Sequence, residues 1–88
     1  MRWKIKYTKT AEKQLKRLEK LERDRIKNYM AERVATADNP RDLGHGLVGE
    51  FQGLWTYKVG SYRVICALLF GEVVVEVTKI AHRRESYR

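Results

Sequence analysis

A chain of 88 residues has room for one small domain and one hydrophobic core, which leaves no space for a second. Hydrophobic residues make up 43% of it, which argues against global disorder, and the net charge of +8 favours a polyanionic partner, RNA or DNA before a membrane. An acidic protein partner would also neutralise this charge. The single cysteine excludes a disulfide framework and a cysteine-based zinc site.

The first stretch, Arg2–Tyr7, alternates basic and apolar residues, which is typical of a half-buried strand. Trp3, Ile5 and Tyr7 share one face, so we expect them in the core and the strand at a sheet edge, where the lysines of the other face discourage further pairing. Residues 1–9 contain no continuous apolar run. We therefore expect neither a signal peptide nor a membrane span, and a cytoplasmic location.

Two helices are expected next. Thr8 or Thr10 can cap a helix that starts near Lys9 or Ala11. A second helix is expected over about residues 21–36, because the apolar stripe changes phase near residues 19–22; a single bent helix is the alternative. Basic residues that lie mostly off the apolar stripe are Lys13, Lys16, Arg17 and Lys20. They form either a solvated surface or a non-specific footprint on a nucleic-acid backbone.

The second half of the chain reads as a loop followed by three strands. Pro40 ends the helical region, and residues 42–53, with four glycines and His45, are expected to form a surface loop. Strands are expected over residues 54–59, 62–70 and 73–80. Two-residue type II′ turns at Gly60-Ser61 and Gly71-Glu72 would join them.

These turns set a register in which directly opposed residues share a face. Lys58 then pairs with Arg63, and Phe70 pairs with Val73. The more apolar face holds Trp55, Tyr57, Val59, Tyr62, Val64, Cys66, Leu68, Val75 and Val77, and the other holds Thr56, Lys58, Arg63, Ile65, Ala67, Glu76 and Thr78. A slip of one residue would mix the two sets. We expect the first set, with a buried and inert Cys66, to meet the helices, and the second to face solvent.

The order strand, helix, helix, strand, strand, strand predicts an α+β fold. Runs of helices and strands, in place of strict alternation, indicate that the two N-terminal helices pack on one face of a small, mostly antiparallel four-stranded sheet. We expect residues 1–88 to form a single domain.

A cluster of cations is predicted at one end of the open face. Lys58 and Arg63 lie directly opposite each other, an arrangement that destabilises a sheet by about 0.2–1 kcal/mol when nothing compensates the charges. The same register places Ile80 beside Arg63. The tail that leaves the sheet at this end contains His82, Arg83, Arg84 and Tyr87. Splayed, solvated side chains are one interpretation, and a site for an anion such as phosphate is the other.

Over nearly its whole length the chain resembles the RelE/ParE superfamily of bacterial toxins from type II toxin–antitoxin pairs. The most specific part is the pattern W-x-Y-K-x-G-x-Y-R at residues 55–63, followed by H-R-R-x-x-Y at residues 82–87. Similarity to RelE implies a ribosome-dependent endoribonuclease that cuts mRNA in the ribosomal A site. It also implies a bacterial or archaeal cytoplasmic protein that contacts ribosomal RNA, needs no cofactor or metal, and oligomerises mainly through an acidic antitoxin.

By position, the resemblance assigns the site to Lys58, Arg63, Arg83 and Tyr87. Thr56 stands where RelE carries its first strand lysine, and this departure raises His82 as a possible acid or base. Thr56 and Arg84 are expected to contact RNA.

The expected chemistry is attack of an RNA 2′-OH on the adjacent phosphate, which needs a base, cations for the phosphorane charge, and an acid or cation at the 5′ oxygen. Arg63 and Arg83 would stabilise charge, Lys58 would be a local cation or base, and Tyr87 would stack on a nucleotide. Two alternatives stay open: a ParE-like inhibitor of DNA gyrase that acts by binding, and a non-enzymatic nucleic-acid-binding module.

Overall fold

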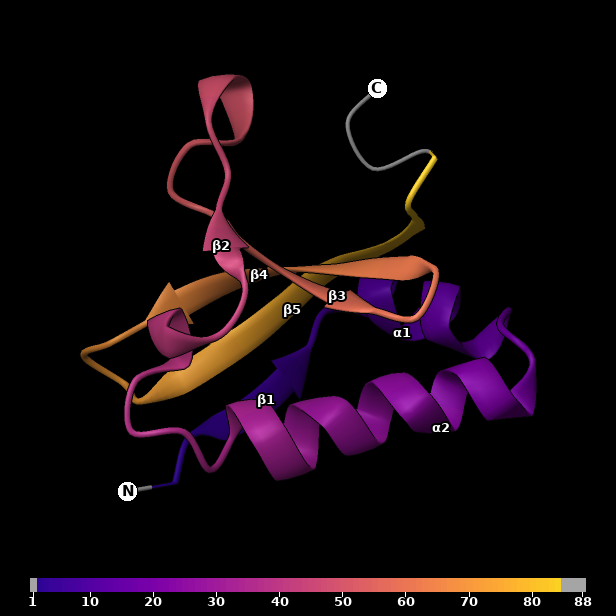
Figure 1. The fold of residues 1–88 in the computed structure, drawn as a ribbon, viewed down its shortest axis with the longest axis horizontal. Helices are drawn as coiled ribbons and strands as arrows, with labels where there is room; N and C mark the ends of the chain where they lie inside the picture. Colours follow the sequence, from indigo (N-terminus) through magenta and orange to yellow (C-terminus); the bar gives the residue numbers. More distant parts are fainter. Residues whose placement is uncertain (1, 85–88) are drawn as a thin grey trace.

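Two helices lie along one face of a five-stranded mixed sheet in the computed structural model of the chain, which describes residues 2–84 (Figure 1). The helices and strands are α1 (Lys9–Lys16), α2 (Lys20–Tyr29), β1 (Lys4–Tyr7), β2 (His45–Gly46), β3 (Trp55–Val59), β4 (Tyr62–Leu69) and β5 (Val74–His82). The strand order is β1-β5-β4-β3-β2, with β1 parallel to β5 and the other pairs antiparallel. The predicted α+β class and the edge position of the first strand are confirmed.

The sheet differs from the prediction by one strand. His45 pairs with Thr56 and Gly46 with Trp55, so the expected loop contributes the short edge strand β2. The prediction of four strands is wrong, because two residues among glycines carry no alternation from which a strand could be predicted. Gly44 permits the close approach of this segment: its φ is 65°, and a Cβ atom there would overlap the Thr56 carbonyl oxygen.

The helical region is shaped by one side-chain cap and one break. The Thr8 hydroxyl accepts a hydrogen bond from the Ala11 N–H at 3.1 Å, so α1 begins where predicted. Residues 17–19 separate α1 from α2, so the chain forms two helices and not one bent helix. A π-helical turn, Met30–Val34, extends α2, and a short 3-10 turn, Pro40–Asp42, follows. Within residues 2–84, no helix has both the length and the apolar character needed to cross a membrane.

The core lies between the helices and the sheet face that was predicted to be apolar. Its buried members include Ala11, Leu15, Ile26, Met30 and Val34 from the helical region, and Tyr57, Val59, Val64, Cys66, Val75 and Val77 from the sheet. The rest of the predicted set, Trp55, Tyr62 and Leu68, packs against this cluster. The predicted face is therefore confirmed. Burial raises the pKa of the Cys66 thiol, which fits the expected unreactive cysteine.

The first hairpin turn is confirmed. Val59 pairs with Tyr62, and Lys58 pairs with Arg63. Gly60 has a φ of 61°, the left-handed value that the first position of a type II′ turn requires. The register of β3 against β4 is therefore the one that the sequence predicts.

The second hairpin turn is wider than predicted. The last pair of the β4–β5 ladder joins Leu69 and Val74, so residues 70–73 form a four-residue loop and Phe70 does not pair with Val73. The positive φ, 56°, falls on Val73 and not on Gly71. The Phe70 ring meets the Trp3 ring edge-on at 5.2 Å, a long-range contact that a two-residue turn would not provide.

Candidate functional site

A β-bulge in β5 determines which side chains reach the candidate site. Cys66 pairs with Val77, but Ile65 pairs with Lys79, so Thr78 is an extra residue without a partner position on β4. The Thr78 hydroxyl donates a hydrogen bond to the Ile65 carbonyl at 3.0 Å, and the Thr8 hydroxyl donates one to the Thr78 carbonyl at 3.2 Å. Two side-chain hydrogen bonds thus hold the bulge in place.

The bulge shifts the end of β5 by one residue relative to the prediction. Ala81, and not Ile80, lies opposite Arg63, and Ile80 is buried against the core. Because a one-residue shift moves every following side chain to the other face, the prediction that Ile80 lies beside Arg63 is wrong. The open face at this end carries Arg63 beside the small Ala81, and alternation places Arg83 on the same face.

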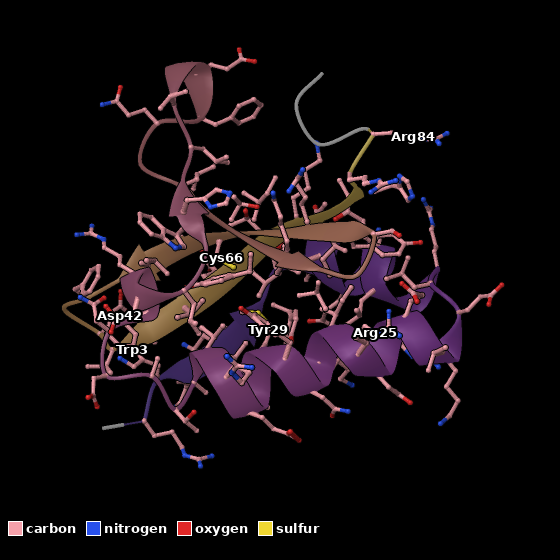
Figure 2. All side chains as sticks on the ribbon, in the orientation of Figure 1. Trp3, Arg25, Tyr29, Asp42, Cys66 and Arg84 are labelled. Atoms are coloured by element: carbon pink, nitrogen blue, oxygen red, sulfur yellow. The ribbon has the colours of Figure 1, made fainter. Side chains whose placement is uncertain are left out.

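This face of the sheet therefore carries a row of cations, Lys58, Arg63 and Arg83. Figure 2 shows Arg84, the next residue of the chain, far from Trp3 at the other end of the sheet. Lys58 pairs with Arg63 across β3 and β4, as predicted. The Arg83 N–H donates to the Ser61 carbonyl at 2.9 Å, which continues the β4–β5 pairing past the last strand residue. The side chains of Lys58 and Arg83 are exposed, and Arg63 is half-buried.

His82 does not lie in this row. It pairs with Tyr62, and the two rings meet edge-on at 5.5 Å with an interplanar angle of 83°. Because Tyr62 packs against the core, His82 lies on the side of the helices, where it lines a pocket with Gln14 and Arg17 that Lys79 also borders at the edge of β5. The prediction that His82 shares a patch with Lys58 and Arg63 is wrong, and the bulge is the physical reason.

The His82 ring is also held by a backbone group. Its Nδ1 accepts a hydrogen bond from the Arg84 N–H at 3.3 Å, which fixes the orientation of the ring. Arg84 itself is exposed. Tyr87, the tail residue expected to stack on a nucleotide, lies outside the described residues.

Thr56 does not face solvent. It is fully buried, and its hydroxyl has no hydrogen-bond partner within residues 2–84. β2 runs beside it, with His45 paired to Thr56, so the segment that was predicted to be a surface loop lies next to this residue. The expectation that Thr56 contacts RNA therefore has no support in this conformation.

The basic residues of the helical region are exposed but lie on the other side of the sheet. Lys13 and Lys16 belong to α1, Arg17 follows it, and Lys20 begins α2, where its ammonium pairs with Asp24 at 3.1 Å. Lys13, Lys16 and Lys20 lie on the helical side of the sheet and are not brought to the row of Lys58, Arg63 and Arg83. Arg17 differs from them, because it lines a pocket with His82 and Lys79 at the end of β5.

Lys79 joins the open face, and sequence reasoning missed it. It pairs with Ile65, which belongs to the same face as Arg63. Simple alternation along β5 places Lys79 with Val77 and Val75 in the core, and only the bulge moves it. The unfavourable burial of a lysine beside those valines was the one signal that could have indicated a break in the alternation.

Side chains able to bind a metal ion do not cluster in the part of the chain that the structure describes. No three His, Cys, Asp or Glu residues of residues 2–84 come together at one place.

Comparisons with known proteins agree on the family. The family model described as the ParE toxin of the type II toxin–antitoxin system parDE matches residues 5–87. The toxin RelE of Mycobacterium tuberculosis is 41% identical over 51 residues, which are 58% of this chain and 53%, about half, of that relative.

Solved structures show the same fold at lower identity. The toxin–antitoxin complex RelBE2 of M. tuberculosis matches with a TM-score of 0.86 at 19% identity, covering 97% of this chain and 95% of that chain. A mutant of E. coli toxin RelE in the free state matches with a TM-score of 0.77 at 19% identity over 98% of this chain and 88% of that one. The archaeal RelE–RelB complex of Pyrococcus horikoshii gives 0.73 at 22% identity over 98% and 100%. The chain therefore belongs to the ParE toxin family of type II toxin–antitoxin systems, within the RelE/ParE superfamily that its sequence resembles.

Proposed function

We propose that this toxin is a ribosome-dependent endoribonuclease that cuts mRNA in the ribosomal A site and so inhibits translation. The observation that carries the proposal is the register of β3, β4 and β5. It aligns Lys58, Arg63 and Ala81 across one face of the sheet, with Arg83 next on that face. Guanidinium and ammonium groups that share one face around a small side chain are suited to bind one phosphate together.

The reaction that such a face supports is internal transfer at one phosphate. The 2′-oxygen loses its proton to a base and bonds to phosphorus, the bond to the 5′-oxygen breaks, and that oxygen takes up a proton. The products are a 2′,3′-cyclic phosphate and a 5′-hydroxyl. Arg63 and Arg83 would stabilise the added negative charge on the phosphorane, and Lys58 would act as the local cation or base.

Both proposed partners follow from the charge of the chain. The net charge of +8 favours mRNA and ribosomal RNA as ligands and an acidic antitoxin as the inhibitor. A bacterial or archaeal cytoplasm, which holds ribosomes, is the proposed location. Covering the face of Lys58, Arg63 and Arg83 by the antitoxin would block access to the phosphate.

The test is in vitro translation of a defined mRNA with the purified toxin, with 5′ ends mapped by primer extension. We expect new ends within A-site codons, reduced by orders of magnitude in Arg63→Ala and Arg83→Ala and unchanged in Lys6→Met, an exposed lysine of β1. Intact mRNA in the presence of folded toxin, or full cleavage by Arg83→Ala, would contradict the proposal.

A second candidate function rests on the description of the matching family as ParE. We propose inhibition of DNA gyrase by binding as the alternative, because it needs the scaffold but not a cationic catalytic face. A gyrase supercoiling assay separates the two. Inhibited supercoiling with intact mRNA favours gyrase, and unaffected supercoiling with A-site cleavage favours the nuclease.

A further inference from the structure

We propose that Lys79 is a catalytic cation of this toxin and stabilises the negative charge that develops on the RNA phosphate. The inference rests on the proposed nuclease function and adds a residue to it. Lys79 lies outside both sequence patterns that carry the family resemblance, at residues 55–63 and 82–87. Its place in the site comes from the bulge of β5 alone.

The register places Lys79 next to the cations already described. Lys79 pairs with Ile65, and Arg63 pairs with Ala81, so Lys79 and Arg63 are diagonal neighbours on the open face of an antiparallel pair. Diagonal neighbours lie about 7–8 Å apart, which long side chains span. Ala81, next to Arg63 and two residues from Lys79, has a side chain too small to separate them.

The surroundings keep the Lys79 charge available. Lys79 is partly exposed and borders the pocket of Gln14, Arg17 and His82 at the edge of β5. Its partner Ile65 is only 2% exposed, so we infer that the aliphatic stem of Lys79 helps to cover the isoleucine while its ammonium reaches water. Within residues 2–84, Lys79 forms no ion pair. A partly exposed ammonium on the face of Arg63, without an ion pair among these residues, is suited to an anionic ligand.

Lys79 also supplies a cation near residue 56, where Thr56 replaces the first strand lysine of RelE. Thr56, Ile65 and Lys79 occupy one cross-strand row on β3, β4 and β5. Thr56 is buried and offers no charge, but Lys79 lies in the same row, two strands away, or about 10 Å between Cα atoms. The row therefore keeps one cation, contributed by β5 and not by β3.

Lys79→Met tests the charge while keeping an apolar stem over Ile65. Cleavage on programmed ribosomes would be measured for the unsubstituted toxin, Lys79→Met, Lys79→Arg and the matched charge control Lys6→Met. We expect Lys79→Met to lower kcat about 100-fold or more with KM changed less than about 3-fold, because transition-state charge stabilisation acts on kcat. Lys79→Arg should keep kcat within about 10-fold, and Lys6→Met should match the unsubstituted toxin. Urea denaturation checks that all four chains fold.

Three results would overturn the inference. Equal kcat in Lys79→Met and Lys6→Met would make Lys79 a solvated lysine that covers Ile65. A raised KM with unchanged kcat would make it a binding contact only. Loss of activity in Lys79→Arg as complete as in Lys79→Met would exclude charge as its contribution. Absence of cleavage by the unsubstituted toxin overturns the nuclease function itself, whereas cleavage lost in Arg83→Ala but kept in Lys79→Met overturns this inference alone.

Discussion

Gln14 of α1 holds the end of β5 through one partly buried hydrogen bond, and its removal should destabilise the fold. Its Oε1 accepts from the Ile80 N–H at 2.7 Å, and Ile80 is 4% exposed. β1 ends at Tyr7, paired with Val77, so no strand formed by residues 2–84 covers this edge of β5 near Ile80. The side chain of Gln14 supplies the acceptor that a neighbouring strand would otherwise provide.

Gln14→Leu keeps the size of the side chain but leaves the Ile80 N–H without an acceptor. A buried unsatisfied donor costs about 1–3 kcal/mol, and in a domain of this length each kcal/mol lowers Tm by about 4–8 °C. Urea denaturation should show a lower midpoint with an unchanged slope, because the surface exposed on unfolding is the same. Amide hydrogen exchange should show faster exchange at Ile80.

Two variants make the test specific. Gln14→Glu retains an acceptor oxygen and should keep most of the stability, and Gln52→Leu makes the same change at an exposed residue and should stay within about 0.5 kcal/mol. If Gln14→Leu and Gln52→Leu have the same midpoint, and Ile80 exchanges at the unsubstituted rate, the hydrogen bond contributes nothing and the reasoning is refuted.

Two further predictions concern the rest of the fold. Gly44→Ala should lower the free energy of unfolding by more than about 2 kcal/mol in a urea titration, because a Cβ atom there meets the Thr56 carbonyl and the Tyr57 ring. Gly49→Ala is the control: this residue also has a positive φ, but nothing lies within 4 Å of its added Cβ, so the loss should be only about 1–2 kcal/mol. Equal losses in the two variants would contradict this prediction. Burial raises the pKa of Tyr7 to about 12 and also raises the pKa of Tyr57 and Cys66, so above about pH 9 the unfolded chain releases protons that the folded chain keeps. The free energy of unfolding should be unaffected by these groups below that pH. It should fall by up to about 1.4 kcal/mol per pH unit for each group as the pH rises toward 12. A urea midpoint that is constant from pH 8 to 11 would contradict this prediction.

Much of the fold could be predicted from local patterns. Alternation identifies the core face of the strands, a capping threonine marks the start of α1, and Gly60-Ser61 is enough to pair Lys58 with Arg63. These features depend on residues that are close in sequence, so they can be predicted from the sequence directly. The motif that relates the chain to toxins also consists of residues that are close in sequence.

The composition of the site depended on contacts between distant parts of the chain. The bulge at Thr78 is held by Thr8, 70 residues away, and the edge beyond it by Gln14, 66 residues from Ile80. No local sequence pattern indicates that a strand contains an extra residue. One such residue nevertheless moves every following side chain of the strand to the opposite face of the sheet.

The sequence by itself therefore determined the α+β class, the helices, the β3–β4 register and the cationic character of Lys58, Arg63 and Arg83. Only the tertiary structure decided that His82 lies on the side of the helices, that Thr56 is buried beside β2, and that Lys79 shares the face of Arg63. The physical reason is parity: side chains alternate along a strand with period two, and long-range hydrogen bonds decide where that period is interrupted.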